Sequence, residues 1–440
     1  MKSEQKKFNQ NNPSSIQVSL KKQEGLHPTG NMNSRQQKEL SEFLTKTSII
    51  LITYALLLVF NVNTKIAFPI LIIMVLSNAY KLKSLSFLFN KFVKTDISSH
   101  RAELINAVKS IQEYNAKTKK WNSRRRSAYN QMSGHHKDIG NKIGYLARVS
   151  KVEQAIQENS IVLEDIAKSA IQKYNIEPSE MRLAVPSVQN FRVIESLCHY
   201  QRDWSSVGEK EVAPILEFYK KGLSKLGSNV KKSNTAVIVP GSGLGRVAHE
   251  IGLEGYQQVH AVEYSMLMHL FNEFVYSEQN NKNYTIYPYI HSYSHHISEA
   301  NQLRTINLNG SRPKPENLTL HNADFRKFEL PNPEGIENVI IVTEFFIDTA
   351  ENVFEYLDSI SKLVQGKNGY WINLGPLKYG SAPKIEPNLE EWKELRALYG
   401  WKDIEEVDPL KDDLIGYLTD KKSLWQGNYG VARWISKISK

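Results

Sequence analysis

The feature that most constrains this chain is a glycine turn just past its middle. Residues 236–246 read Ala-Val-Ile-Val-Pro-Gly-Ser-Gly-Leu-Gly-Arg, so an apolar run enters a proline and glycines follow at alternate positions. Glycine adopts a positive φ readily and lets the backbone approach a ligand where a Cβ would collide. The apolar run predicts a strand, and a helix is expected to open near Arg246. A ligand should therefore lie at the carboxyl end of this strand.

Downstream of residue 235 the sequence alternates between β-rich and helical stretches. A helical pattern over Glu351–Val364 separates two of the β-rich runs. The runs that we expect to be strands are Thr235–Pro240, Val259–Glu263, Val339–Thr343 and Tyr370–Asn373. Such alternation predicts an α/β domain whose parallel sheet carries helices on its faces.

The spacing of the glycines separates two classes of nucleotide ligand. The dinucleotide fingerprint G-x-G-x-x-G/A would put its third small residue at Arg246, whose side chain obstructs close packing of helix on strand. The observed spacing, G-x-G-x-G, is similar to the first motif of the Rossmann-like S-adenosylmethionine methyltransferases. A purely structural glycine turn stays open, because short motifs are weak signals on their own.

Two acidic residues follow the turn at positions that suit a nucleoside. Glu263 ends the second expected strand, 22 positions after Gly241. A carboxylate there can accept hydrogen bonds from both ribose hydroxyls, and it could equally cap the next helix. Asp324, in an expected loop over His321–Phe325, could receive an adenine amino group while Phe325 packs on the ring.

The N-terminal part of the chain has a different character. Residues 1–46 are polar and predict a disordered tail. Residues 47–80 hold two uncharged apolar runs, Ser48–Val62 and Ile66–Ala79. Each run is shorter than the roughly 20 residues of an upright membrane helix.

Three interpretations of these runs stay open. A membrane hairpin would place Lys65 at its turn, a single tilted span would have to snorkel Lys65, and a soluble protein would bury both runs as core helices. Lysines on both sides favour the hairpin, since they would keep both ends in the cytoplasm. We therefore expect membrane association through residues 48–79 with the catalytic domain facing the cytoplasm, or a soluble cytoplasmic protein if the runs are core.

Residues 81–230 read mainly as helices and include a basic cluster. Asn115–Arg126 holds six Lys or Arg and no acid, and the whole chain has a formal net charge of +10. The cluster could meet anionic lipid headgroups, nucleic acid or only solvent. We expect no nucleic-acid partner, because no aromatic-interleaved strand motif accompanies it. The single cysteine, Cys198, excludes an internal disulfide.

A stripe of apolar residues further along predicts an amphipathic helix or pair of helices. Its members are Val149, Val152, Ala155, Ile156, Ile161 and Ile166.

Five ordered stretches resemble the carnosine N-methyltransferase family. They are Arg202-Asp-Trp-Ser205, Val237-Ile-Val-Pro-Gly-Ser-Gly-Leu-Gly-Arg246, Tyr287-Pro-Tyr-Ile-His291, Phe345-Phe-Ile-Asp-Thr-Ala350 and Trp371-Ile-Asn-Leu-Gly-Pro-Leu377. The resemblance implies a Rossmann-like methyltransferase sheet over 231–440 and an N-terminal helical extension over 81–230 that helps close the cofactor site. It implies S-adenosylmethionine as cofactor and, as substrate, a histidine-containing dipeptide such as carnosine, methylated on an imidazole nitrogen.

The resemblance also assigns roles on the cofactor side of the site. Arg202 would contact the methionyl carboxylate, for which a planar guanidinium is suited. Gly241 and Gly243 would pass beneath the cofactor. Glu263 would hold the ribose, and Asp324 with Phe325 would hold the adenine. Arg202 could instead be a surface charge.

On the substrate side, Asp348 is the expected catalytic residue, because its carboxylate can select an imidazole tautomer and stabilise the cation that forms. Asp348 could instead cap the following helix. His291 and Tyr429 are the other expected substrate contacts. Three histidines, His291, His295 and His296, lie close together in the sequence. No group of three acidic residues accompanies them, so no metal site is expected.

The chain departs from the family pattern at three places. The family usually has a histidine shortly after Gly-Pro-Leu, and Leu377–Gly380 contains none. It places tyrosines before an apolar strand near the C-terminus, where Gln426-Gly-Asn-Tyr429 supplies only one. His199 stands three residues before Arg202, where a glutamine is expected. Two other functions stay open. The altered substrate motifs permit a membrane-anchored cofactor-binding protein without turnover, and the basic helix could recruit RNA or protein, which would make the chain a macromolecular methyltransferase. A homodimer is compatible with the sequence.

Overall fold

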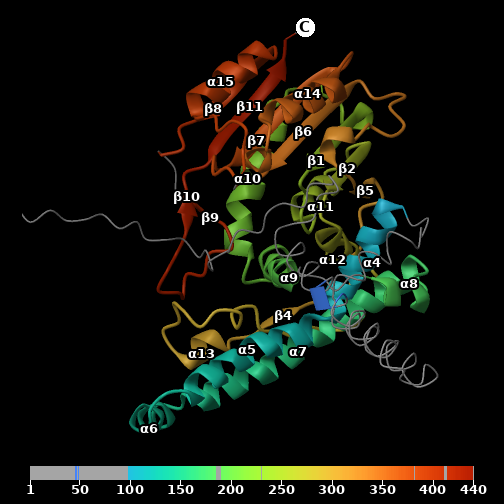
Figure 1. Ribbon diagram of the computed structural model, residues 1–440. Coiled ribbons are helices and arrows are strands. Elements are labelled where there is room, and N and C mark those ends of the chain that lie inside the picture. The colour runs from blue at the N-terminus through green and yellow to red at the C-terminus, as the bar shows by residue number, and fades with distance from the viewer. Residues whose placement is uncertain are drawn as a thin grey trace, which may run out of the picture. The chain divides into compact units, whose positions relative to one another are not determined.

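The computed structural model describes residues 45, 46, 48, 98–184, 190–228, 230–380, 382–410 and 414–439 (Figure 1). The chain divides into two compact units, Met1–Ile97 and Ser98–Lys440. The second unit contains every element described below. Almost all of the expected tail over 1–46 and of the apolar runs within 48–79 lies outside the described residues.

A seven-stranded sheet forms the centre of the second unit, in the order β5-β2-β1-β6-β7-β11-β8. These strands are β1 Thr235–Pro240, β2 Gln258–Glu263, β5 Leu318–Asn322, β6 Asn338–Glu344, β7 Asn368–Gly375, β8 Trp401–Val407 and β11 Ala432–Ile438. The first five in this order pair in parallel, and their arrangement is that of a doubly wound Rossmann-like sheet. All four expected strands are present.

The sheet is mixed, which corrects the expectation of a parallel sheet. Strand β11 pairs antiparallel with both β7 and β8. A parallel connection needs a crossover, usually a helix, whereas the described residues between β8 and β11 form a short two-stranded ladder. That ladder pairs β9 Ile415–Gly416 with β10 Asn428–Tyr429, and a second ladder pairs β3 Tyr284–Ile286 with β4 Ile306–Leu308.

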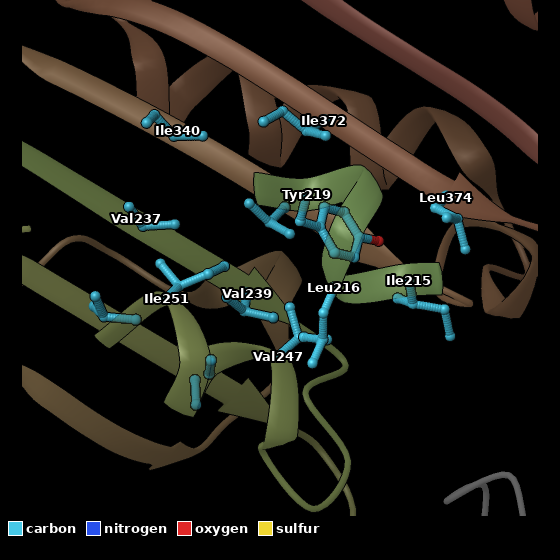
Figure 2. Packing of buried hydrophobic residues seen from close by; sticks show 14 of the residues in the cluster. Ile215, Leu216, Tyr219, Val237, Val239, Val247, Ile251, Ile340, Ile372 and Leu374 are labelled. Atoms are coloured by element: carbon cyan, nitrogen blue, oxygen red, sulfur yellow. The ribbon is translucent and has the colours of Figure 1, made fainter. Parts of the chain in front are cut away.

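Helices cover both faces of the sheet because successive side chains of a buried strand point to opposite sides. On one face, Val237 and Val239 of β1 pack against α10 Glu209–Lys225 and α11 Arg246–Gly252. On the other, Ala236 and Ile238 pack towards α14 Val353–Val364. Figure 2 shows the first face, where Ile215, Leu216 and Tyr219 of α10 meet Val237, Val239, Ile340, Ile372 and Leu374.

The polypeptide before the sheet is helical. Its helices are α4 Ser99–Gln112, α5 Tyr114–Asn130, α6 Gly134–Lys142, α7 Tyr145–Lys173, α8 Pro178–Leu183 and α9 Asn190–Trp204. The long helix α7 packs against α4, α5 and α12 Met266–Val275. It carries the predicted apolar stripe, and all of its members are buried except Ile161, which is 43% exposed.

The membrane part of the predicted fold needs correction. Among the described residues, no helix has both the length and the apolar character that crossing a membrane would require. The predicted hairpin over 48–79 itself lies outside these residues, apart from Ser48. The fold is therefore a Rossmann-like α/β sheet with a helical part before it, and the hairpin is removed from its description.

Candidate active site

The glycine turn forms a bend without side chains at the carboxyl end of β1. Gly241 and Gly243 adopt φ values of 61° and 54°, the left-handed region that favours glycine. A Cβ on Gly241 would lie 2.4 Å from Cδ2 of Phe346, whereas a Cβ on Gly243 would meet no atom within 4 Å. Gly241 therefore makes room for the Phe346 ring, which lies in the segment that follows β6, and Gly243 borders open space.

Glu263 lies at the end of β2, beside the turn. Its Oε2 accepts a hydrogen bond from the Gly243 N–H at 2.8 Å, and its Oε1 accepts one from the Ser265 N–H at 2.7 Å. Ser265 is the residue that caps α12 with its own side chain. Burial raises the pKa of Glu263, and the two N–H groups oppose that effect. The carboxylate thus ties the turn to the start of α12 and keeps lone pairs for further donors.

Just beyond β5, Asp324 caps the 3-10 helix η2 Phe325–Lys327, and Phe325 is the first residue of that helix. The expected loop over His321–Phe325 is therefore shorter, since His321 and Asn322 end the strand. Arg326 binds the Asp324 carboxylate at 2.7 Å, and this contact holds the pKa of Asp324 below its usual range. Asp324 is thus already paired within the protein.

Phe325 is 4% exposed and belongs to the aromatic core beneath the turn. Its ring meets Phe346 edge-on at 5.5 Å, and Phe346 stacks on Tyr356 at 4.5 Å. Since Phe346 is the ring beside Gly241, it is the better placed of the two to border a ligand on the turn.

Arg202 is buried at the end of α9, within hydrogen-bond distance of three carboxylates. Its Nη1 contacts Asp203 at 3.0 Å, its Nε contacts Glu211 at 3.1 Å and its Nη2 contacts Glu344 at 2.5 Å. Two of the five guanidinium N–H groups remain for another acceptor. Burial raises the pKa of Asp203 to about 7, so this network can take up a proton near neutral pH.

Sequence reasoning missed Glu344, Glu211 and Tyr417. Glu211 accepts hydrogen bonds from the Leu418 and Thr419 N–H groups at 2.6 and 3.0 Å. This anchors Tyr417, whose ring stacks on Phe345 at 4.6 Å. The position of Glu344, at a strand end directly before a family motif, was a signal for it. No local signal joins Glu211 to a turn more than 200 positions away.

Asp348 lies in the 3-10 helix η3 Ile347–Thr349, directly after β6. The Lys378 N–H donates to its Oδ2 at 3.2 Å, and burial raises the pKa of Asp348 to about 6. The alternative role as a helix cap is wrong, because Asn352 caps α14.

Tyr429 lies in β10, and the structure connects it to Asp348 through one residue. The Lys378 ammonium donates to the Tyr429 hydroxyl at 3.3 Å, while the same residue's N–H binds Asp348. The Tyr429 ring also meets Phe345 edge-on at 6.3 Å. The structure thus brings Asp348 and Tyr429 together and adds Lys378, at one of the places where the chain departs from the family pattern.

His291 has both ring nitrogens engaged by protein groups. The Pro288 carbonyl can only accept, so Nδ1–H donates to it at 3.3 Å. Nε2 of the neutral ring then accepts from the Tyr114 hydroxyl at 2.7 Å, and that hydroxyl accepts from Asn159 at 3.2 Å. Burial lowers the pKa of His291 to about 4, which keeps the ring neutral. No contact joins His291 to Asp348 or Tyr429 within the described part of the chain.

Metal ligation has no candidate in the described residues, since no three His, Cys, Asp or Glu side chains gather there in a way that could hold an ion.

Comparisons with known proteins place these features in a family. A family model described as carnosine N-methyltransferase matches residues 180–440. The carnosine N-methyltransferase of Schizosaccharomyces pombe is 30% identical over 342 residues, 72% of this chain and 90% of that protein. An uncharacterised protein of Saccharomyces cerevisiae is 30% identical over 369 residues, 74% of this chain and 79% of that protein.

A solved structure, magnesium protoporphyrin IX methyltransferase from Synechocystis with bound SAH, aligns with a TM-score of 0.33 at 10% identity, covering 57% of this chain and 96% of that one. The family model and the Schizosaccharomyces pombe relative bear the name of the family that the five motifs resemble. This chain belongs to the carnosine N-methyltransferase family, whose members are S-adenosylmethionine-dependent N-methyltransferases.

Proposed function

We propose that this protein transfers a methyl group from S-adenosylmethionine to an imidazole nitrogen of a histidine-containing dipeptide such as carnosine. The observation that carries the proposal is that the glycine turn and the segment holding Asp348 follow neighbouring strands of the sheet. Strands β1 and β6 are parallel neighbours, so their carboxyl ends lie at the same edge, and the Phe346 ring fills the space beside Gly241. The carboxylate proposed for the imidazole and the bare backbone proposed for the nucleoside therefore lie at one edge of the sheet.

The chain's own residues fit the cofactor. The open space at Gly243 admits a ligand against the main chain, and Glu263 has lone pairs left after binding two N–H groups. We assign Glu263 to the ribose, with Asp324 and Phe325 on the adenine side. When bound, S-adenosylmethionine supplies an activated methyl group on a sulfonium.

Arg202 is proposed to meet the cofactor's carboxylate through its two remaining N–H groups. Three protein carboxylates already surround the guanidinium, so a fourth is accepted more readily when Asp203 holds a proton. Helix α9 belongs to the proposed helical extension over 81–230 and carries Arg202 to the end of β6. This supports the proposal that the extension helps to close the site.

Asp348 is proposed as the catalytic residue. Its carboxylate accepts the N–H of one imidazole nitrogen, which fixes the tautomer and turns the lone pair of the other nitrogen towards the methyl group. After transfer the ring is positive, and the buried carboxylate stabilises that charge. No strong base is needed before attack, because the attacking nitrogen of a neutral imidazole carries no proton.

Lys378 is proposed to bind the carboxylate of the dipeptide. Its ammonium is exposed, contacts the Tyr429 hydroxyl, and has no carboxylate within 4.0 Å among the described residues. Its N–H binds Asp348, so a peptide held at both groups would present its imidazole to one and its terminus to the other. His291, engaged by protein on both nitrogens, is proposed to position its own segment, Tyr287–His291.

The test uses the full chain with methyl-labelled S-adenosylmethionine and separate pools of dipeptides, proteins and RNA. We expect label in carnosine at an imidazole nitrogen, located by mass spectrometry, and none in β-alanyl-alanine, which lacks the ring. Label confined to proteins or RNA would contradict the proposal, and so would cofactor binding without any labelled product.

A further inference from the structure

One part of the second unit carries a large excess of positive charge. Residues 117–151 hold ten Lys or Arg and a single Asp, a net charge of +9, whereas the rest of that unit, residues 98–116 and 152–440, carries a net charge of −7. Residues 117–151 form most of α5, all of α6 and the first turns of α7, which we call the arm. Figure 1 shows α5 and α7 running side by side with α6 at their far end.

Most of the arm's cations lack an acidic partner. Lys117, Arg126 and Lys151 are the ones that lie within 4.0 Å of a carboxylate in the described part of the chain. Lys120, Arg124 and Lys142 are exposed. A solvated helix face of a folded protein normally mixes both signs, so this excess needs a partner to account for it.

The end of the arm also exposes apolar side chains. Ile143 is 75% exposed, Met132 49% and Ile139 47%, all within one short stretch around α6. The stretch is held in place by Tyr129, which is buried. Its hydroxyl donates a hydrogen bond to the Lys137 carbonyl at 2.5 Å, and its ring stacks on Tyr145 at 5.6 Å. The apolar side chains are therefore held outward by the fold.

The arm's aromatic rings are engaged with protein groups. Arg125 lies 3.7 Å over the Trp121 ring, Tyr129 is buried, and Tyr145 stacks on it. Binding of single-stranded nucleic acid depends on rings that are free to stack on bases. Cations around exposed aliphatic side chains instead match a surface with anionic headgroups over an apolar layer.

We propose that the arm docks on the surface of membranes rich in anionic phospholipid. The contact is peripheral: Arg124, Lys137 and Lys142 meet headgroup phosphates and carboxylates, while Ile139 and Ile143 enter the boundary with the acyl chains. It does not involve residues 48–79. The contact is also independent of the methyl acceptor, so it stands or falls separately from the proposed reaction.

The experiment is co-sedimentation of the full chain with phosphatidylcholine vesicles that contain or lack phosphatidylserine. The charge variant carries Arg124→Ser, Lys137→Ser and Lys142→Ser. We expect the wild type to bind the phosphatidylserine vesicles and the charge variant to bind about a hundredfold more weakly. Since residues 48–79 are present in both proteins, any binding through them cancels in this comparison.

Two further proteins sharpen the test. The apolar variant, Ile139→Ser with Ile143→Ser, keeps every charge and should bind about tenfold more weakly. The control, Lys231→Ser with Lys362→Ser and Lys402→Ser, removes the same charge from the sheet region and should bind within about twofold of wild type. Methyl transfer in solution should be unchanged in all three, which shows that they fold.

Several results would overturn the docking proposal. These are the absence of wild-type binding, equal binding to vesicles without phosphatidylserine, and charge or apolar variants that bind as wild type does. Gel shifts with transfer RNA and duplex RNA form the last arm: binding to RNA that the charge variant loses, without binding to vesicles, would assign the arm to nucleic acid instead.

Discussion

The two halves of the candidate site are built in different ways. The proposed cofactor half consists of Gly241, Gly243 and Glu263, which lie at the ends of the paired strands β1 and β2. The proposed substrate half consists of Asp348, Lys378 and Tyr429, which come from η3, the segment after β7, and β10. The first half is fixed by one turn and its neighbouring strand, whereas the second exists only because three distant segments meet.

The carboxylates of the two halves differ accordingly. Glu263 accepts two backbone N–H groups, and Asp348 accepts the Lys378 N–H. Burial raises the pKa of both, to about 6 for Asp348. A carboxylate that is buried with few donors is poised to take a cation, which is what a methylated imidazole becomes.

The largest expected effect comes from removing the charge of the substrate half. Asp348→Asn should lower kcat/KM for carnosine by about a hundredfold to a thousandfold, because the positive ring loses its counter-charge. The affinity for S-adenosylmethionine, measured by calorimetry, should stay unchanged. The matched control is Asp358→Asn, an exposed carboxylate on α14. Equal loss of cofactor affinity would mean that the two halves are not separate.

The next effect tests the cofactor half through the two glycines. Gly241→Ala should destabilise the fold by about 2–3 kcal/mol and weaken cofactor binding, because its Cβ would overlap the Phe346 ring as well as strain the backbone. Gly243→Ala has open space and should cost only the strain, about 1 kcal/mol. Thermal unfolding and calorimetry measure both, and equal costs at the two positions would contradict this assignment.

A pH profile should separate activity from stability at Asp348. Activity should fall at least about tenfold between pH 7 and pH 5, since the carboxylate with a pKa of about 6 becomes protonated and the substrate's imidazole, with an ordinary pKa of about 6.5, does so as well. Stability should move the other way. The folded-state pKa lies above the ordinary value, so the contribution of Asp348 to the free energy of unfolding is present at low pH and is lost as the pH rises through about 6.

The measurement for stability is the difference in unfolding free energy between wild type and Asp348→Asn at several pH values. The difference should change by at most about 3 kcal/mol between pH 4 and pH 7. Burial also raises the pKa of Asp203. Its pH-dependent contribution to the unfolding free energy is the same in both proteins, so it cancels in the difference. A difference that does not vary with pH would show that Asp348 keeps an ordinary pKa.

The smallest effect concerns the terminus of the substrate. Lys378→Met should raise KM for carnosine by about fivefold, the upper range for an exposed ion pair. It should leave KM for the amide of carnosine unchanged, because that substrate lacks the carboxylate. Lys384→Met, another exposed lysine in the same connection to α15 (Leu389–Leu398), is the control. A similar rise for both substrates would place Lys378 in a role other than charge recognition.

Much of the cofactor half could be predicted because its signals are local. The apolar run, the glycines and the acid 22 positions later lie on one strand–turn–helix–strand unit, and each residue type follows from backbone geometry there. The four expected strands share this property, since a buried parallel strand reads as a short apolar run. The antiparallel strand β11 was missed because its direction depends on a connection, which leaves no mark in the strand itself.

The substrate half could be predicted only in part. Asp348 follows a strand end and belongs to a motif, so its position was readable. In the segment that contains Lys378, the sequence showed only that the family's histidine is missing. The contacts of Lys378 with Asp348 and Tyr429 were not foreseen. Arg202 was singled out from its motif, but its three carboxylate partners lie up to 142 positions away.

The sequence by itself determined the class of fold, the bend that exposes main chain at the end of β1 and the family to which the chain belongs. These follow from short-range rules: periodicity, the conformational freedom of glycine and the spacing of motifs. Only the tertiary structure decided which charges pair, which carboxylates are buried and that Lys378 joins Asp348 to Tyr429. Pairing and burial depend on which segments meet when the sheet closes, and residues far apart in the chain carry no local record of that meeting.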